Sequence, residues 1–197
     1  MRILALLIAL CWATPALAAD QYEIDKSHTT ILFFIAHLGF SQMIGKFNEY
    51  DGHFRFDPAE PEESSVDITI KPKGVHTSSE ALDEVLQNEH FFNSKQFPDI
   101  HFVSTKITVT GERDGDITGN LTMLGVTRPL TLHVHLNKAD YRPITNEFAA
   151  GFSATGMLKR SDFGMDYAIP MVGDEVKLMI ETEGVDLDRK NAEKIKH

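Results

Sequence analysis

The sequence predicts an all-β domain with one or two short helices, folded as an eight-stranded antiparallel β-barrel around an apolar lumen. Apolar and polar residues alternate in eight segments separated by turn residues, which is the pattern of half-buried strands. Several segments exceed ten residues, whereas strands in globular proteins usually have about 5–6. Glycines inside three of the segments, at Gly52, Gly119 and Gly156, fit the bends that close a barrel.

The expected strands follow one another with short connections. They are 22–38, 45–57, 64–71, 99–110, 115–123, 127–137, 147–159 and 173–184. Turn residues fill the connections at 57–61, 111–115 and 124–126, and from Arg142-Pro143 onward. One helix interrupts the series: Thr77 and Glu80 have the spacing of a capping box, and one helical face carries Ala81, Leu82, Val85 and Leu86.

The first strand is apolar on both of its faces. One face carries Ile31, Phe33, Ile35 and His37, and the other carries the alternating residues from Leu32 to Leu38. A barrel strand with a solvated outer face needs only one apolar face. We therefore expect the first set to face the lumen and the second to be covered by the helix or by a second copy of the chain. A homodimer is one open alternative, and a buried strand of a two-layer fold is another.

Both ends of the chain are predicted to lie outside the barrel. Residues 1–19 combine a basic start, an apolar run and the small residues Ala16-Leu17-Ala18, as in a cleaved secretory signal peptide. The apolar run is shorter than the about 20 residues of a spanning helix, so no stable membrane span is expected. The barrel domain should cover 20–185, and the charged segment 186–197 should be a disordered tail.

The charge and the cysteine content exclude some classes of function. The chain has 29 Asp and Glu against 19 Lys and Arg, a net charge of −10 at pH 7. Such a chain is repelled by a phosphate backbone, so a nucleic-acid partner is not expected. The single cysteine, Cys11, lies in the expected signal peptide, so the domain that follows has no thiol for catalysis or metal ligation.

The residues expected to line the lumen are apolar, with small residues among them. A lumen of eight strands can be filled by its own side chains or can hold one ligand. Ala150, Ala154 and Gly156 leave room on the inner face, and an apolar lumen would hold an apolar ligand. The alternative is a lumen filled by its own side chains, with nothing bound. The expected ligand-lining residues are Ile31, Phe33, Ile35, Phe47, Phe54, Phe102, Leu121, Met123, Leu130, Leu132, Phe152 and Leu178.

A set of short motifs runs in one order along nearly the whole chain after residue 20. They include Phe33-x-Ile35-x-His37-Leu38-Gly39-Phe40-Ser41, Asp51-Gly52-x-Phe54-x-Phe56-Asp57, Phe91-Phe92-Asn93, Gly119-x-Leu121-Thr122-x-x-Gly125-Val126-Thr127-x-Pro129 and Lys159-x-x-Asp162-Phe163-Gly164. Together they resemble the YceI-like polyisoprenoid-binding proteins. The resemblance implies a lipocalin-like barrel exported to the bacterial periplasm. It also implies that the barrel sequesters or carries a polyprenyl phosphate or an isoprenoid quinone, without catalytic residues and without a cofactor other than that lipid.

Strand alternation sorts the connections into two ends of the barrel. The end with the connections 57–64, 111–116 and 138–147 is strongly acidic, whereas basic residues gather at the other. A basic rim over an apolar tube suits a lipid whose phosphate pairs with Arg or Lys. The expected head-group ligands are His37, Arg128, Lys159 and Arg160. Nearby aspartates that neutralise this rim are the alternative, and the helix with Phe91-Phe92 could serve as a lid.

Two rival functions stay open. An enzyme acting on an isoprenoid quinone or lipid would need an acid or base beside the ligand, and His37 and His28 are the candidates. A periplasmic metal-binding or stress protein would use His133 and His135, which share one face of a strand. No third ligand stands at a telling spacing, so a solvated strand face is the preferred explanation of those two histidines and no metal site is assigned.

Overall fold

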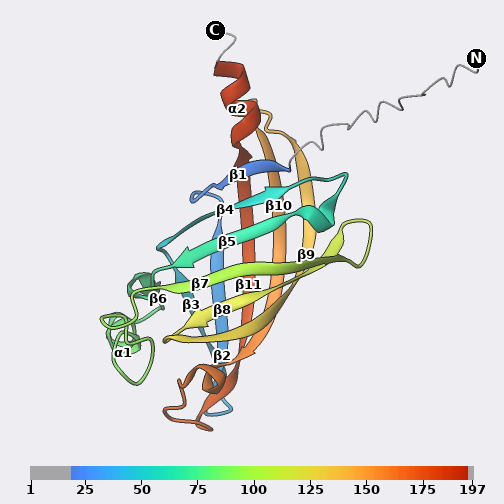
Figure 1. Ribbon diagram of the computed structural model, residues 1–197. Coiled ribbons are helices and arrows are strands. Elements are labelled where there is room, and N and C mark those ends of the chain that lie inside the picture. Colours follow the sequence, from blue (N-terminus) through green and yellow to red (C-terminus); the bar gives the residue numbers. More distant parts are fainter. Residues whose placement is uncertain (1–18, 195–197) are drawn as a thin grey trace, which may run out of the picture.

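The computed structural model describes residues 19–194, and over this range the chain forms an eight-stranded antiparallel β-barrel (Figure 1). The predicted fold class is confirmed. Pairing between the last strand and the first closes the ring. In order around the ring, the strands are β1 (Asp20–Ile24), β4 (Tyr50–Phe56), β5 (Ser65–Ile70), β7 (Ile100–Val109), β8 (Asp114–Met123), β9 (Val126–Tyr141), β10 (Phe148–Lys159) and β11 (Val172–Asp186).

The expected strand 22–38 is divided in two by a turn. β1 and β2 (Thr30–His37) lie end to end along the same neighbour, β11. The break is local in origin: the Asp25 side chain accepts a hydrogen bond from the Ser27 backbone amide at 2.9 Å, and the Asp25 carbonyl accepts from His28 at 3.1 Å. An Asp that bonds the backbone two residues on is a turn former, so it ends the strand.

The next strand positions are divided in the same way. The expected strand 45–57 becomes β3 (Ser41–Phe47) and β4, and β6 (Val75–His76) continues the line of β5 beside β3. The backbone amide of Lys71 donates to the Glu49 carbonyl at 2.8 Å, which ties these breaks together. The barrel therefore keeps the predicted eight strand positions, but three of them are each divided into two shorter strands.

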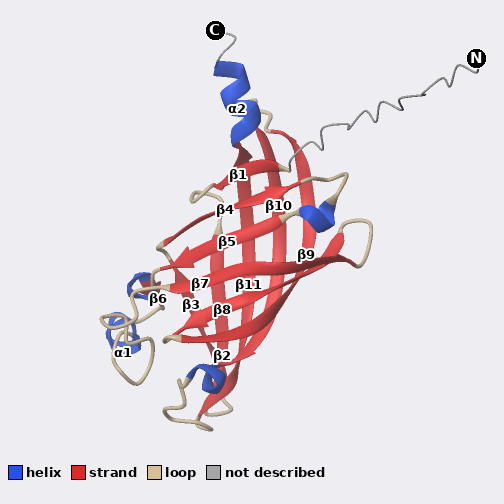
Figure 2. Cartoon of the chain, in the orientation of Figure 1, coloured by secondary structure: helices blue, strands red, loops and turns tan. Residues whose placement is uncertain are grey.

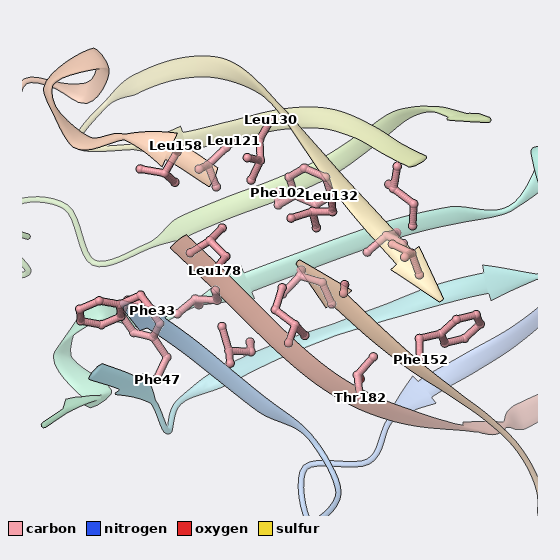
Figure 3. A pocket seen from close by; sticks show the side chains of 18 of the residues that line it. Phe33, Phe47, Phe102, Leu121, Leu130, Leu132, Phe152, Leu158, Leu178 and Thr182 are labelled. Atoms are coloured by element: carbon pink, nitrogen blue, oxygen red, sulfur yellow. The ribbon is translucent and has the colours of Figure 1, made fainter. Parts of the chain in front are cut away.

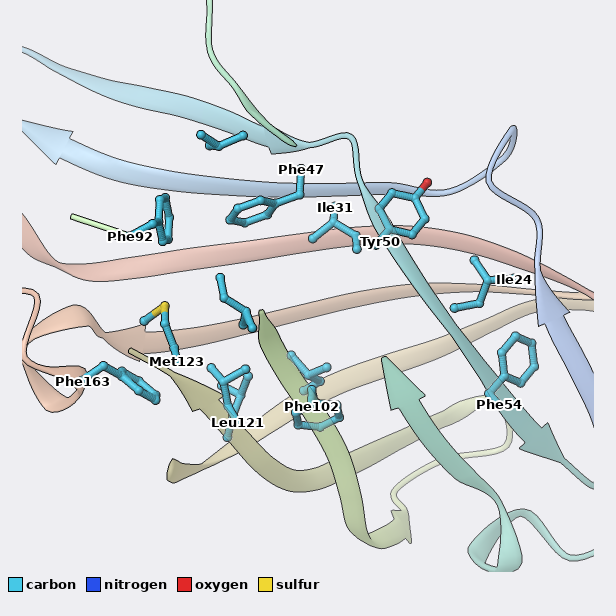
Figure 4. Packing of buried hydrophobic residues seen from close by; sticks show 14 of the residues in the cluster. Ile24, Ile31, Phe47, Tyr50, Phe54, Phe92, Phe102, Leu121, Met123 and Phe163 are labelled. Atoms are coloured by element: carbon cyan, nitrogen blue, oxygen red, sulfur yellow. The ribbon is translucent and has the colours of Figure 1, made fainter. Parts of the chain in front are cut away.

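The inner face of the barrel holds the hydrophobic core. The register places Ile31 opposite both Phe47 and Ile180, so alternate residues of β2, β3 and β11 share one face. The ring centroids of Phe33 and Phe47 are 5.5 Å apart. Figure 4 shows these inward side chains converging from strands on opposite sides of the barrel.

The helices lie at the ends of the barrel (Figure 2). α1 (Glu80–Leu86) has Ser79 as its N-cap, whose side chain accepts from the Leu82 amide at 3.4 Å. The capping box predicted for Thr77 is therefore wrong, because the Thr77 hydroxyl donates to Asp83 at 2.7 Å instead. α1 makes its main contacts with β6 rather than with the outer face of β2. The three short 3-10 helices are η1 (Pro61–Glu63), η2 (Pro72–Gly74) and η3 (Arg160–Phe163).

The disordered tail predicted for 186–197 differs from the structure over 186–194, and residues 195–197 lie outside the described residues. β11 extends to Asp186, and residues Leu187–Lys194 form a helix, α2. The backbone amide of Gln21 donates to Asp188 at 2.9 Å, and the guanidinium of Arg189 lies 3.8 Å from the centre of the Phe148 ring. These contacts order a segment whose charge alone suggested disorder.

Residues 1–18, which include almost all of the predicted signal peptide, lie outside the described residues. Among the residues that are described, no helix is both long and apolar enough to cross a membrane. The predicted cleavage and export therefore stay predictions.

An ion-pair cluster joins the β1–β2 turn to the C-terminal ends of β9 and β11. The Arg142 guanidinium contacts the Asp25 carboxylate at 2.7 Å and the Glu183 carboxylate at 2.5 Å. Burial alone would raise the pKa of Asp25, but hydrogen bonds from His28, Arg142 and the Ser27 amide lower it to about 2. The Asp25 side chain is only 15% exposed, so this interaction is weakly screened by solvent.

This cluster predicts a pH dependence of stability. Because the folded-state pKa of Asp25 lies below its ordinary 3.8, its contribution is complete above about pH 4 and is lost as the pH falls towards 2. The shift corresponds to about 2 kcal/mol. We expect Asp25→Asn to lower the free energy of unfolding by about this amount at pH 6, with the two proteins converging near pH 2 in urea titrations. A constant difference from pH 6 to pH 2 would contradict the assignment.

Candidate ligand-binding cavity

A single large cavity occupies the interior of the barrel. Its volume is about 470 Å³, within the range of ligand pockets in proteins. Its lining is almost entirely apolar and draws on every strand of the ring, with β1 contributing Ile24 alone. Figure 3 shows Phe33, Phe47, Phe102, Phe152, Leu121, Leu130, Leu132 and Leu178 directed into this space.

All of the residues expected to line the lumen do line this cavity. They are Ile31, Phe33, Ile35, Phe47, Phe54, Phe102, Leu121, Met123, Leu130, Leu132, Phe152 and Leu178. Small side chains keep the space open: Ala154 lines the cavity between Val134 and Ile180, its partners on the neighbouring strands. Contact between these residues and a ligand stays a prediction.

The cavity extends to both ends of the barrel. At one end its lining includes Pro58, Pro61 and the loop Gly111–Gly115. At the other end it includes His37 and Met43 of the β2–β3 hairpin. The interior is therefore a tube, long enough to suit a chain-like ligand better than a compact one.

Leu82, Leu86, Phe91 and Phe92 also line the cavity at the hairpin end. The Phe92 ring is 8% exposed and lies 5.6 Å from Phe47 in an edge-on arrangement. Phe91 meets Tyr167 edge-on at 5.7 Å, which links this segment to the β10–β11 loop. The helix and the Phe91-Phe92 pair therefore form part of the cavity wall at this end, and their role as a lid stays a prediction.

Arg160 is a charged side chain buried at the hairpin end of the cavity. It is 2% exposed and it lines the cavity. Its guanidinium donates four hydrogen bonds to backbone carbonyls of the β10–β11 connection and the start of β11: to Met165 at 3.0 Å, Tyr167 at 2.9 Å, Val172 at 3.0 Å and Gly173 at 2.7 Å. A guanidinium has five N–H groups, so one N–H of Nη1 remains for a further hydrogen bond.

No carboxylate touches this guanidinium in the described structure. Burial lowers the pKa of Arg160, and the negative charges of Asp174 and Asp166 act in the opposite direction. Asp174 itself is held by Ser161, whose amide and hydroxyl donate to it at 2.9 Å and 2.8 Å. The end of the tube therefore carries a buried positive charge, which attracts an electron-rich head group.

The structure separates the four residues expected at the head group. His37 and Arg160 line the cavity, whereas Arg128 and Lys159 line a separate surface pocket with Asp162 and Glu175. The reason is that β10 ends at Lys159 and the chain turns into η3, which carries Arg160 inward and leaves its neighbour outside. Arg128 is exposed and its guanidinium donates to the Thr127 carbonyl at 3.2 Å. The predicted place of Arg128 and Lys159 at the cavity mouth is thus corrected.

Sequence reasoning missed a polar pair in the lumen. The hydroxyls of Thr29 and Thr182 lie 2.9 Å apart, both residues line the cavity, and the Tyr50 hydroxyl donates to the Thr29 carbonyl at 2.8 Å. Thr182 continues the alternation of Leu178 and Ile180 and could have been found from it. Arg55 and Arg113, at the acidic end, also line the cavity and were not predicted.

The histidines of the rival functions lie elsewhere, except for His37. His133 and His135 face outward on β9, where their Nδ1 atoms pair with Asp116 at 2.6 Å and Asp114 at 2.7 Å. Neither histidine belongs to the groups of three adjacent potential metal ligands that the described residues contain. His28 pairs with Asp25 and is not part of the cavity lining.

Comparison with known proteins identifies the family. The model of the YceI-like domain matches residues 22–184, which is most of the chain. The chain belongs to the YceI-like family. A UPF0312 protein of Pseudomonas aeruginosa strain LESB58 is 39% identical over 187 residues, which cover 94% of this chain and 96% of that protein.

Solved structures share the barrel. The crystal structure of BcnA from Burkholderia cenocepacia matches with a TM-score of 0.74 at 21% identity, covering 81% of this chain and 98% of that one. A polyisoprenoid-binding domain from Saccharophagus degradans, implicated in plant cell wall breakdown, matches with a TM-score of 0.60 at 10% identity, covering 84% and 98%. At these identities the likeness is one of fold.

Proposed function

We propose that this YceI-like protein is an exported, non-catalytic lipid carrier that holds a long isoprenoid chain, such as a polyprenyl phosphate or an isoprenoid quinone, inside its barrel. The observation that carries the proposal is the continuous apolar cavity of about 470 Å³. Removing apolar surface from water is favourable by about 25 cal/mol per Å², and a chain enclosed along its length gains the most. The polyisoprenoid-binding domain of the same fold supports this choice of ligand.

The hairpin end of the tube suits the head group. His37 and the buried Arg160 together offer a ring nitrogen and a positive charge at the point where the apolar lining ends. A phosphate or a quinone oxygen placed there would accept from both, while the chain lies against the aromatic and aliphatic side chains behind. At the acidic end, Glu112 and Asp114 line the cavity beside Arg55 and Arg113. The two carboxylates offset the two guanidinium charges, which makes this end less favourable for a phosphate.

Substitution of His37 tests the position of the head group. We expect His37→Leu to weaken binding of a polyprenyl phosphate about 10-fold, because one charge-assisted hydrogen bond is worth about 1.5 kcal/mol. Binding of the corresponding plain alcohol should change less. The comparison variant is Arg113→Ala, at the opposite end, which we expect to leave both affinities unchanged. If Arg113→Ala weakened phosphate binding and His37→Leu did not, the head group would lie at the acidic end.

Extraction of the purified protein tests the function itself. The protein is purified from the periplasm of a bacterium that produces it, extracted with organic solvent and analysed by mass spectrometry. An isoprenoid lipid present in proportion to protein supports the proposal. Protein that carries no lipid, and that does not take up added polyprenol or quinone, contradicts it.

A further inference from the structure

Two adjacent segments at the hairpin end of the barrel lack charged residues. They are residues 38–45 of the β2–β3 hairpin and residues 167–173, which lead from the β10–β11 connection into β11, and neither contains Asp, Glu, Lys or Arg. The Leu38 amide donates to the Met171 carbonyl at 2.7 Å, and His37 pairs with Val172, so the two segments are held side by side. They lie together at the lower end of the barrel in Figure 1. We call these two segments the tip.

The tip exposes large apolar side chains. Phe40 is 91% exposed, Met171 58%, and Leu38, Ile44 and Tyr167 51% each. These are five of the ten large apolar side chains that are exposed in the described part of the chain. A contiguous apolar surface of this kind marks an interaction site. About a quarter of the residues of this acidic chain are charged, so two adjacent segments without any charge are unusual in it. Such a surface suits an apolar partner, in which a buried charge would be unfavourable.

The backbone conformation of the β2–β3 hairpin is a second observation on the tip. Phe40 donates to the His37 carbonyl, and the central turn residues Leu38 and Gly39 have φ of 52° and 73°. Such a turn strongly favours Asn-Gly, and a bulky residue at positive φ is strained. Leu124-Gly125 forms a second turn of this kind, with φ of 53° and 76°, but there the leucine packs against the hydrophobic core. Leu38 is half exposed and is not among the described residues that pack against the core, so burial in the chain does not compensate for its positive φ.

The tip adjoins the cavity. His37, Met43 and Ile44 of the hairpin region and Val172 of the facing segment belong to the cavity lining as well. A partner seated on the tip would therefore lie at the opening of the tube. An aromatic ring, a tyrosine and aliphatic side chains without charges are the composition of a surface that enters the interfacial region of a bilayer.

We propose that the tip inserts into the surface of a lipid bilayer and so places the hairpin end of the cavity against the membrane. Insertion is driven by apolar burial and not by attraction of basic residues to anionic lipid, because the chain carries a net charge of −10. The proposal rests on the proposed function only in taking the bilayer as the source of the lipid. Docking itself needs no ligand.

Vesicle sedimentation tests the docking. Wild-type protein is expected to partition onto phosphatidylcholine vesicles that contain no isoprenoid, with little dependence on salt, and to bind more weakly when phosphatidylglycerol is added. Phe40→Ser should reduce the partition coefficient about 10-fold or more, since the ring accounts for much of the inserted surface. Ile144→Ser is the matched control, because Ile144 is 97% exposed in the β9–β10 loop at the other end.

A second variant separates docking from folding. Leu38→Asn places the preferred residue in the turn, so its midpoint of thermal unfolding should equal or exceed that of the wild type while its partition coefficient falls. Insertion is observed directly with Phe40→Trp, because the one natural tryptophan, Trp12, lies in the predicted signal peptide and residues 20–197 contain no other. Its emission should shift to the blue with vesicles, whereas Ile144→Trp should show no shift.

Three results would overturn the proposal: wild-type protein that does not bind the vesicles, equal losses from Phe40→Ser and Ile144→Ser, or a tip that mediates self-association. In the last case the wild type would sediment as a dimer, Phe40→Ser as a monomer, and vesicle binding would be the same for both. Lipid extracted from the purified protein is measured separately. Docking can therefore fail while the carrier function stands, and lipid binding can fail while docking stands.

Discussion

Replacing Arg160 by Met is expected to destabilise the protein by about 4 kcal/mol, because four backbone carbonyls lose their donor at about 1 kcal/mol each. This is a large part of the total stability of a domain of this size. The carbonyls of Met165 and Tyr167 belong to the connection between β10 and β11, and those of Val172 and Gly173 lie where this connection enters β11. That connection covers one end of the cavity, so we also expect it to become susceptible to proteolysis.

Urea unfolding at neutral pH measures the loss, with Lys159→Met as the matched control. Lys159 is the neighbouring exposed cation, and its replacement should change the free energy of unfolding by less than about 0.5 kcal/mol. Arg160→Lys should recover only part of the loss, because an ammonium has three donors and lacks the planar fork. A loss below about 1 kcal/mol for Arg160→Met would show that the carbonyls find other partners and that the arginine does not hold the connection.

Filling the cavity is expected to abolish lipid binding while preserving the barrel. Ala154 lines the cavity midway along β10, between Val134 and Ile180. In Ala154→Phe the new ring has only the cavity to enter, and it would occupy the path of a chain-like ligand. We expect at least a 10-fold fall in the lipid that purifies with the protein, which corresponds to about 1.4 kcal/mol or more of lost binding.

The neighbouring position provides the control for this substitution. Thr155 is exposed on the outer face of the same strand, so Thr155→Phe adds the same ring without entering the cavity. We expect its lipid content to equal that of the wild type. Both variants should give the circular dichroism spectrum of the native β-barrel. Equal lipid content in Ala154→Phe and Thr155→Phe would place the ligand outside the cavity.

The strands and the lumen could be predicted from the sequence because both depend on local alternation. Ile31, Phe33 and Ile35 share a face by period two alone, and the register then places them inside the barrel. The division of the first strand was harder to predict, since Asp25 ends it through a side-chain bond to the backbone and interrupts the alternation at that point.

The rim of the cavity could not be predicted in the same way. Lys159 and Arg160 are adjacent basic residues in the sequence, yet Lys159 is exposed whereas Arg160 is buried, with 2% of its surface accessible. The two side chains point in different directions because β10 ends at Lys159 and because the Arg160 guanidinium donates to four backbone carbonyls. Those carbonyls lie in a segment without alternating apolar and polar residues, so the sequence pattern does not reveal the contact. Likewise, α2 is ordered by contacts with Gln21 and Phe148, which its own charged sequence does not reveal.

The mass of the intact protein under native conditions tests the central claim most directly. We predict that the wild type, purified without detergent from a bacterium that produces it, carries one isoprenoid lipid per chain, seen as a single discrete mass increment. Ala154→Phe should appear without the increment and Thr155→Phe with it. A wild-type protein that shows only the mass of the bare chain, before and after incubation with polyprenyl lipids, would contradict the account.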